Sequence, residues 1–388
     1  MNAKKWTISF VAIILACILA IMSINYFYDP YKYFSAQHGD DYTMDEDDYL
    51  RELKAEHIKY YGDQYDAYLI CGSKGGAVKP SKLKELDGYN YYNCWVLSGN
   101  FPDYLAYAKY IVENTNAKKI LLQISSSELY ELSREDKGTI YEVPAVLSGE
   151  SKFIEVIQML MKNPKITYDE LTAGATANDP NLESGERNLQ HYYDFQSKDL
   201  DAYYKYVMDD SKSLYRYFTK KAKGLEEISL QCLAILREIK ALCEENDVEL
   251  QVYFASLFEP QIIKYDGDAF YSIMEEVVML MDEGEKSSGV WNFNTYNKVA
   301  LCPYNYYNAS HFYYEIADLM VDTMAGKECP YEGFGQYLTR ENIGKVIKER
   351  KKSYNELKDY YEKNQTLPFE GYDSKYNVVK GSKYFSKN

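Results

Sequence analysis

The amino-acid sequence predicts an α/β fold in which crossover helices connect the strands of a parallel sheet. The first observation is a series of short apolar runs that end at glycine, serine or asparagine and alternate with segments of helical spacing. Such an alternation indicates parallel strands with helical crossovers. The second observation is one long apolar stretch near the N-terminus, and the third is a charged helical pattern near the C-terminus.

The first predicted element is a membrane helix, because Trp6 to Ile24 is close to the roughly 20 apolar residues that cross a bilayer. Lys4 and Lys5 precede this stretch, so the positive-inside rule keeps the N-terminus cytoplasmic. A cleaved signal peptide is the competing interpretation, but it has a shorter apolar region and a small-residue cleavage site. Ile14–Cys17 faintly resembles a lipoprotein box, yet apolar residues follow it. We expect a retained single-pass anchor over residues 1–28 in the cell membrane, with an extracytoplasmic soluble domain.

The α/β domain is expected over residues 29–337. Strands are predicted where turn residues bound apolar runs, at 67–71, 92–97, 119–124, 249–255 and 290–293. Helices are predicted from apolar spacing, ending near 61, at about 103–114, 225–246 and 268–281, within 308–324, and at about 340–364. The alternation is lost between about 130 and 214, which we interpret as an irregular insert. Residues 338–388 are expected to form a helical extension and tail.

The composition excludes some classes of function. A net charge of −15 without a basic block argues against nucleic-acid binding. No cysteines have CxxC or zinc-ligand spacing, so we expect no metal site, and we predict no cofactor. Cys302 and Cys329 could pair in an oxidising compartment, and the sequence leaves this open. The candidates for a general base are the four histidines, His38, His57, His191 and His311.

Polar residues suited to catalysis follow the predicted strands. Gly72-Ser73-Lys74-Gly75-Gly76 closes the first strand, and its glycines permit a tight turn and the close approach of a ligand. A serine just beyond a central strand is where open α/β sheets place their chemistry. Gly99–Asn100 and Ser125–Glu128 close the next two strands, and Asn308–His311 lies near the end of the domain.

These motifs, in this order, resemble the SGNH (GDSL-like) hydrolase superfamily over roughly residues 25–325. The resemblance is narrower to membrane-anchored, extracytoplasmic members such as the D-alanyl-lipoteichoic acid biosynthesis and alginate-acetylation proteins. It implies a three-layer α/β/α, flavodoxin-like domain. It also implies that Ser73 is the nucleophile, with His311 as its general base and Asn308 in the place of an aspartate. The backbone N–H of Ser73, with Gly99 and Asn100, would form the oxyanion hole.

Three positions depart from the family pattern. Cys71 stands where the family has the first glycine of Gly-x-Ser, and a frame shifted by one residue would put Lys74 in the nucleophile position; we prefer Ser73. Asn308 replaces the aspartate of Asp-x-x-His, a change that costs about 10⁴ in rate in the serine protease triad. Ser125–Glu128 lacks the asparagine that relatives use in the oxyanion hole.

The resemblance implies a serine-dependent O-acyl transferase or esterase that acts on a bacterial cell-envelope polysaccharide or teichoic-acid-like polymer. By analogy with the family, a multi-pass membrane acyltransferase would be a partner. The alternative is a catalytically degraded SGNH-like domain that binds polymer or serves as a scaffold in an envelope assembly. The departures favour this alternative, whereas Ser73 and His311 favour an enzyme. A structural anchored protein unrelated to SGNH domains is the third possibility.

Overall fold

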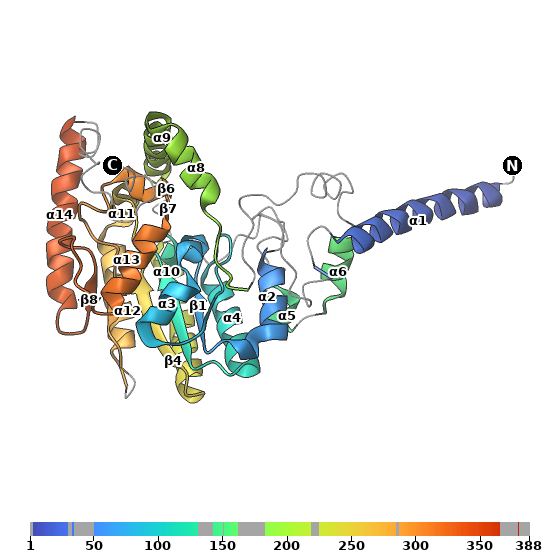
Figure 1. Cartoon of the computed structure of the whole chain (residues 1–388), viewed down its shortest axis with the longest axis horizontal. Coiled ribbons are helices and arrows are strands. Elements are labelled where there is room, and N and C mark those ends of the chain that lie inside the picture. Colours follow the sequence, from blue (N-terminus) through green and yellow to red (C-terminus); the bar gives the residue numbers. More distant parts are fainter. Residues whose placement is uncertain are drawn as a thin grey trace.

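The computed structural model describes residues 3–29, 33–34, 50–130, 143–149, 151–161, 183–218, 225–284, 287–364 and 379. Within these ranges, helices surround one main sheet, and a long N-terminal helix, α1 (Ala3–Tyr28), projects from this body (Figure 1). Parts of the predicted insert and almost all of the predicted tail lie outside the described residues. Among the described residues, α1 is the one helix long and apolar enough to cross a membrane, and the rest of the chain buries none of its most apolar stretch.

The main sheet confirms the predicted α/β class with parallel strands. Its order is β2-β1-β3-β4-β5-β8, and all neighbours are parallel except the last pair. The strands are β1 (Ala67–Ile70), β2 (Tyr91–Asn93), β3 (Lys119–Ile124), β4 (Glu249–Phe254), β5 (Val290–Asn292) and β8 (Gln336–Leu338). The five parallel strands follow the flavodoxin-like order 2-1-3-4-5, in which the strand order reverses between β1 and β3; sheets of this kind bind ligands at the carboxyl ends of the strands beside such a reversal.

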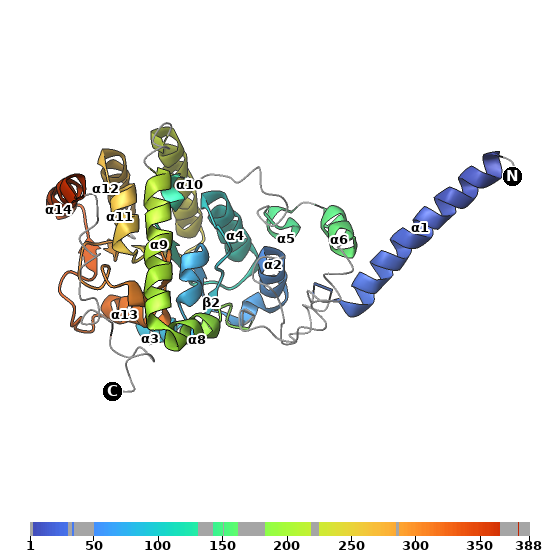
Figure 2. The ribbon, with the colours of Figure 1, turned by 90° about the horizontal axis from the view of Figure 1, so that it is seen from above.

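Helices pack on both faces of the sheet. In β1, Tyr68 and Ile70 belong to one apolar core and Ala67 and Leu69 to the other, because side chains alternate along a strand. Every residue of β1 is therefore buried, as in sheets covered on both faces. The first core contains α4 (Phe101–Asn114), α10 (Leu225–Glu245) and α12 (Asp268–Met281); the second contains α3 (Pro80–Asp87), α9 (Leu200–Phe218) and α13 (Tyr314–Met324). Figure 2 shows α4 and α10 on the side opposite to α3.

Several elements differ from the prediction. The second strand ends at Asn93 instead of Leu97, because the Asn93 side chain accepts a hydrogen bond from the Trp95 N–H and interrupts the regular ladder; beyond it, Val96 still forms an isolated parallel bridge with Gly72. The edge strand β8 and the helix α11 (Glu259–Tyr265) were not predicted. The later part of the predicted irregular insert is helical, comprising α8 (Gln190–Lys198) and α9.

The last long helix, α14 (Ile343–Asn364), is fastened to the domain by a buried ion pair. Arg350 Nε lies 2.9 and 3.1 Å from the two carboxylate oxygens of Asp266, and both side chains are almost fully buried. Tyr296 and Tyr271 donate their hydroxyl protons to the same carboxylate, at 2.8 and 3.2 Å.

Cys302 and Cys329 are free thiols, so the disulfide that the sequence left open is not formed.

Replacing Arg350 by alanine is expected to destabilise the domain by about 3–5 kcal/mol, because Asp266 would stay buried without its cation. Chemical denaturation of the detergent-solubilised full chain measures this loss. Lys351→Ala is the matched control: Lys351 pairs at 2.8 Å with Asp268, whose side chain is 92% exposed. The control should change stability by no more than about 1 kcal/mol. Equal losses for the two variants would contradict the assignment of Arg350 as the main fastening of α14.

Candidate active site

The turn after β1 presents Ser73 at the carboxyl edge of the sheet. Ser73 is the first residue of a short 3₁₀ helix (Ser73–Ala77), where a backbone N–H has no acceptor within the helix. Gly75 makes this turn possible, since a Cβ there would lie 2.1 Å from the sulfur of Cys71. Cys71 is fully buried, and burial raises the pKa of its thiol well above the usual value, so it serves as a small packing residue.

The structure brings Ser73, His311 and Asn308 into direct contact. The Ser73 Oγ lies 2.8 Å from His311 Nε2, and His311 Nδ1 lies 2.8 Å from Asn308 Oδ1. His311 and Asn308 face each other across a small hairpin formed by β6 (Tyr306–Asn308) and β7 (His311–Phe312). Lys74, the alternative nucleophile position, points elsewhere, because its ammonium donates to Ser127 Oγ at 3.0 Å. The geometry therefore favours the frame with Ser73.

The hydrogen bonds around Asn308 determine which nitrogen of His311 carries the proton. The Ser310 N–H can only donate, and it lies 2.9 Å from Asn308 Oδ1, which identifies that atom as the carbonyl oxygen. His311 Nδ1 must therefore donate to the same oxygen. In the neutral ring, Nε2 is then the acceptor, and the Ser73 hydroxyl donates to it. This is the tautomer that a general base toward Ser73 requires.

The surroundings of His311 keep it neutral. Burial, followed by the positive charges of Arg187 and Lys74, lowers the pKa of His311 well below 6.5. The ring of Tyr307 stacks on the imidazole with 5.2 Å between centroids and an interplanar angle of 11°. Arg187 donates to the Tyr307 hydroxyl at 2.8 Å and lies between the rings of Tyr307 and Trp95.

The hairpin that carries His311 is held by residues of two helices. Asp210 on α9 accepts a hydrogen bond from the backbone N–H of Ala309, at 3.0 Å, in the turn between Asn308 and His311. Gln261 on α11 lies 3.4 Å from Ser310 Oγ. Asp210 thus acts on the position of the imidazole through the backbone. The sequence offered no signal for it, because α9 belongs to the region predicted to be irregular.

The segment after β3 supplies a buried carboxylate next to Lys74. The Ser125 N–H donates to Glu128 Oε2 at 2.9 Å, and Lys74 Nζ lies 3.9 Å from Glu128 Oε1. Burial raises the pKa of Glu128, and the charge of Lys74 partly offsets this effect. Glu128 also approaches the turn, since a Cβ on Gly72 would lie 2.9 Å from its Oε1. The sequence placed Glu128 at a strand end but gave no indication of this contact.

The predicted oxyanion residues lie close to the turn, with their N–H groups already engaged. A Cβ on Gly99 would be 2.9 Å from Gly72 Cα, so the two chain segments touch. The Gly99 N–H donates to Val96 O at 3.2 Å, and the Asn100 N–H donates to Asp103 Oδ2 at 3.0 Å within the N-terminal cap of α4. The Ser73 N–H is therefore the best placed of the three predicted donors. The oxyanion roles of Gly99 and Asn100 stay predictions.

Two buried polar side chains that the sequence analysis did not single out hold the backbone of the turn by hydrogen bonds. Asn93 Nδ2 donates to the carbonyls of Gly75 and Val78, each at 2.8 Å. Lys54 on α2 (Leu50–Tyr61) donates to the carbonyls of Asn93 and Gly185, at 2.8 and 2.7 Å. Burial lowers the pKa of Lys54 to about 7. These contacts fix the backbone on which Ser73 sits.

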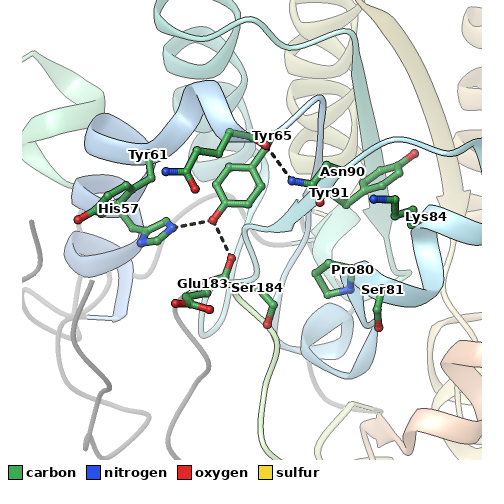
Figure 3. Close-up of a pocket in the computed structure, with 11 residues that line it drawn as sticks. His57, Tyr61, Tyr65, Pro80, Ser81, Lys84, Asn90, Tyr91, Glu183 and Ser184 are labelled. Atoms are coloured by element: carbon green, nitrogen blue, oxygen red, sulfur yellow. Dashed lines mark hydrogen bonds between the residues drawn. The ribbon is translucent and has the colours of Figure 1, made fainter. Parts of the chain in front are cut away.

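A separate hollow of about 700 Å³ lies at the opposite edge of the sheet (Figure 3). Tyr65 and Asn90 line it, and each closely precedes the amino end of a strand, β1 or β2. The Tyr65 hydroxyl gives its proton to the carbonyl of Glu183, at 2.7 Å, so His57 Nε2, at 2.8 Å, must be the donor to Tyr65. Burial, followed by the charge of Lys54, lowers the pKa of His57 to about 4. This hollow does not contain the serine site.

No group of three histidine, cysteine, aspartate or glutamate side chains in the described part of the chain is placed to hold a metal ion. A scan against protein-family models and a search of curated proteins both give no match. The chemistry that the site can perform is therefore inferred from its geometry.

The Asn308→Asp variant tests the electrostatics of the site through its pH dependence. In the wild type, His311 should stay neutral as the pH falls through 6.5, so the reactivity of Ser73 should decline only at lower pH. A carboxylate at position 308 would stabilise the imidazolium and raise the pKa of His311. The labelling rate of Ser73 should then begin to fall at a higher pH in the variant than in the wild type. Measuring the rate of fluorophosphonate labelling as a function of pH tests this. If the labelling rates of wild type and variant declined at the same pH, this result would contradict the contact between residues 308 and 311.

Proposed function

We propose that this chain is a membrane-anchored, SGNH-like serine O-acyl transferase or esterase. The observation that carries the proposal is the 2.8 Å contact between Ser73 Oγ and His311 Nε2, with Asn308 holding the imidazole in the required tautomer. The position of Ser73 at the reversal point of a parallel sheet supports it, because open α/β sheets bind ligands there. Asparagine serves as the third residue in Cys-His-Asn sites, so Asn308 is compatible with activity.

In the proposed reaction, Ser73 Oγ attacks the carbonyl carbon of an acyl ester while His311 Nε2 takes the hydroxyl proton. The tetrahedral oxyanion receives a hydrogen bond from the Ser73 N–H. The ester bond to the leaving alcohol breaks, and His311 returns the proton to that alcohol, which leaves an acyl-serine. A water molecule or an acceptor hydroxyl then attacks the acyl-serine, with His311 again as the base. Ser73 is regenerated, and the net result is hydrolysis or acyl transfer.

The proposed substrate is a polysaccharide or teichoic-acid-like polymer of a bacterial cell envelope. In this proposal α1 crosses the cytoplasmic membrane with Lys4 and Lys5 inside, which puts the α/β domain outside. A multi-pass membrane acyltransferase is the proposed partner, by analogy with the family that the sequence resembles.

The second candidate is a catalytically degraded domain that binds polymer or acts as a scaffold. Asn308 favours it, because a neutral amide cannot stabilise the imidazolium with a full charge. The positive charges of Arg187 and Lys74 act in the same direction, since they disfavour protonation of His311. The engaged N–H groups of Gly99 and Asn100 also leave fewer donors for an oxyanion.

Labelling with a fluorophosphonate probe distinguishes the two candidates. The full chain in detergent should be labelled, Ser73→Ala should not, and His311→Ala should react about 10²–10⁴-fold more slowly, because it lacks the general base. Ser81→Ala, which changes an exposed serine on α3, is the matched control and should react like wild type. A folded wild-type protein that neither reacts nor hydrolyses p-nitrophenyl acetate would favour the scaffold.

A further inference from the structure

One face of the short helix α6 (Phe153–Leu160) exposes large apolar side chains. Phe153 is 71% exposed, Ile154 is 67% exposed, and Met161, which ends the helix, is 41% exposed. Ile157 lies between them on the same side. At 100° per residue, these four residues fall within an arc of about 100°. We define them as the α6 apolar face.

The opposite side of α6 attaches to the protein body. Met159 is buried, and the carboxylate of Glu155, one turn earlier on the same side, accepts a hydrogen bond from the backbone N–H of Ala145 at 3.0 Å. Glu155 also accepts the hydroxyl proton of Tyr33, which follows α1 in the chain. Lys152, just before the helix, pairs with Glu56 on α2. These contacts fix the rotation of α6 and leave its apolar face outward.

The α6 helix adjoins the end of α1 where α1 meets the body (Figure 1). Asn25 Nδ2 on α1 donates to the carbonyl of Leu160, at 2.9 Å, and so satisfies one of the terminal carbonyls of α6. The next three residues of α1 are aromatic and exposed: Tyr26 (54%), Phe27 (81%) and Tyr28 (59%). Aromatic residues at the end of a membrane helix mark the level of the membrane–water interface. The contact with Asn25 therefore brings α6 to that level.

We propose that α6 lies on the surface of the bilayer that α1 crosses, with its apolar face in the boundary between headgroups and acyl chains. The α6 helix contacts the end of α1, and the apolar surface of α1 requires lipid up to the exposed aromatic residues at that end. In the sequence, Lys162 and Lys165 closely follow the helix, and lysines at this position suit anionic headgroups. The proposal rests on the insertion of α1, which is part of the proposed function. It adds a second membrane contact that orients the domain.

Spin-label quenching of a fluorophore tests the contact. The full chain is reconstituted in vesicles of equal parts phosphatidylcholine and phosphatidylglycerol, with or without phosphatidylcholine spin-labelled near the top of the acyl chain. A nitrobenzoxadiazole label is attached at one position at a time: Phe153→Cys, Tyr360→Cys or native Cys17. Cys17 and Cys329 are replaced by alanine where they are not the label site, which leaves the other cysteines buried.

The label at position 153 should lose roughly half of its fluorescence in spin-labelled vesicles, since interfacial helices insert about 5–10 Å. The label at position 360 should have the same fluorescence in vesicles with and without the spin label. That residue is 42% exposed and belongs to α14, at the far end of the body from α1 in Figures 1 and 2. Ile154→Asp should weaken quenching at position 153, because a charge disfavours insertion of the face.

The Cys17 label separates failure of this proposal from failure of the anchor. Quenching at position 17 without quenching at position 153 would overturn the membrane contact of α6 and keep the anchor. No quenching at either position would overturn both. Equal quenching at positions 153 and 360 would also overturn the proposal, because it would indicate nonspecific adsorption of the whole domain.

Discussion

The proposed active site depends on the position of β1 between β2 and β3. The strand order reverses at this point, and open α/β sheets bind ligands at the carboxyl edge beside such a reversal. Ser73 lies at that edge, and Lys74 bridges to Ser127 and Glu128 beyond β3. On the β2 side, Gly72 and Gly99 touch directly. With the turn held on both sides, a histidine 238 residues later in the chain can meet Ser73 in a defined orientation.

The charges around the site keep the imidazole of His311 neutral. His311 has an amide, and no carboxylate, at Nδ1, while Arg187 and Lys74 disfavour its protonation. Arg187 is bonded to the Tyr307 hydroxyl and Lys74 to Ser127 Oγ, so both cations are held in place beside the imidazole and the turn. Glu128 is a buried carboxylate near Lys74.

Sequence patterns predicted the elements that depend on local periodicity. The bounds of β3 and α12 agree with the prediction, because their apolar positions are clear and turn residues bound them. The edge strand β8 is only three residues long and pairs with β5 far earlier in the chain, so no local pattern marks it. Part of the buried stripe of α9 is Tyr203 and Val207, in a tyrosine-rich segment where apolar spacing is hard to recognise. Ser73, His311 and Asn308 followed from motif order, whereas Arg187 and Asp210 act through tertiary contacts with no sequence signature.

The buried ion pair of α14 has a consequence for how the chain folds during synthesis. Asp266 lies in the interior of the domain, yet its cation, Arg350, comes 84 residues later. At 5–20 residues per second, the ribosome needs roughly 4–17 s to supply it. During that interval the carboxylate has tyrosine hydroxyls within reach but lacks the charge of Arg350, and removing one partner of a buried ion pair is strongly destabilising. The domain therefore completes its folding only after nearly the whole chain has been made, and a nascent chain that stalls before α14 would expose an unfinished core to proteases.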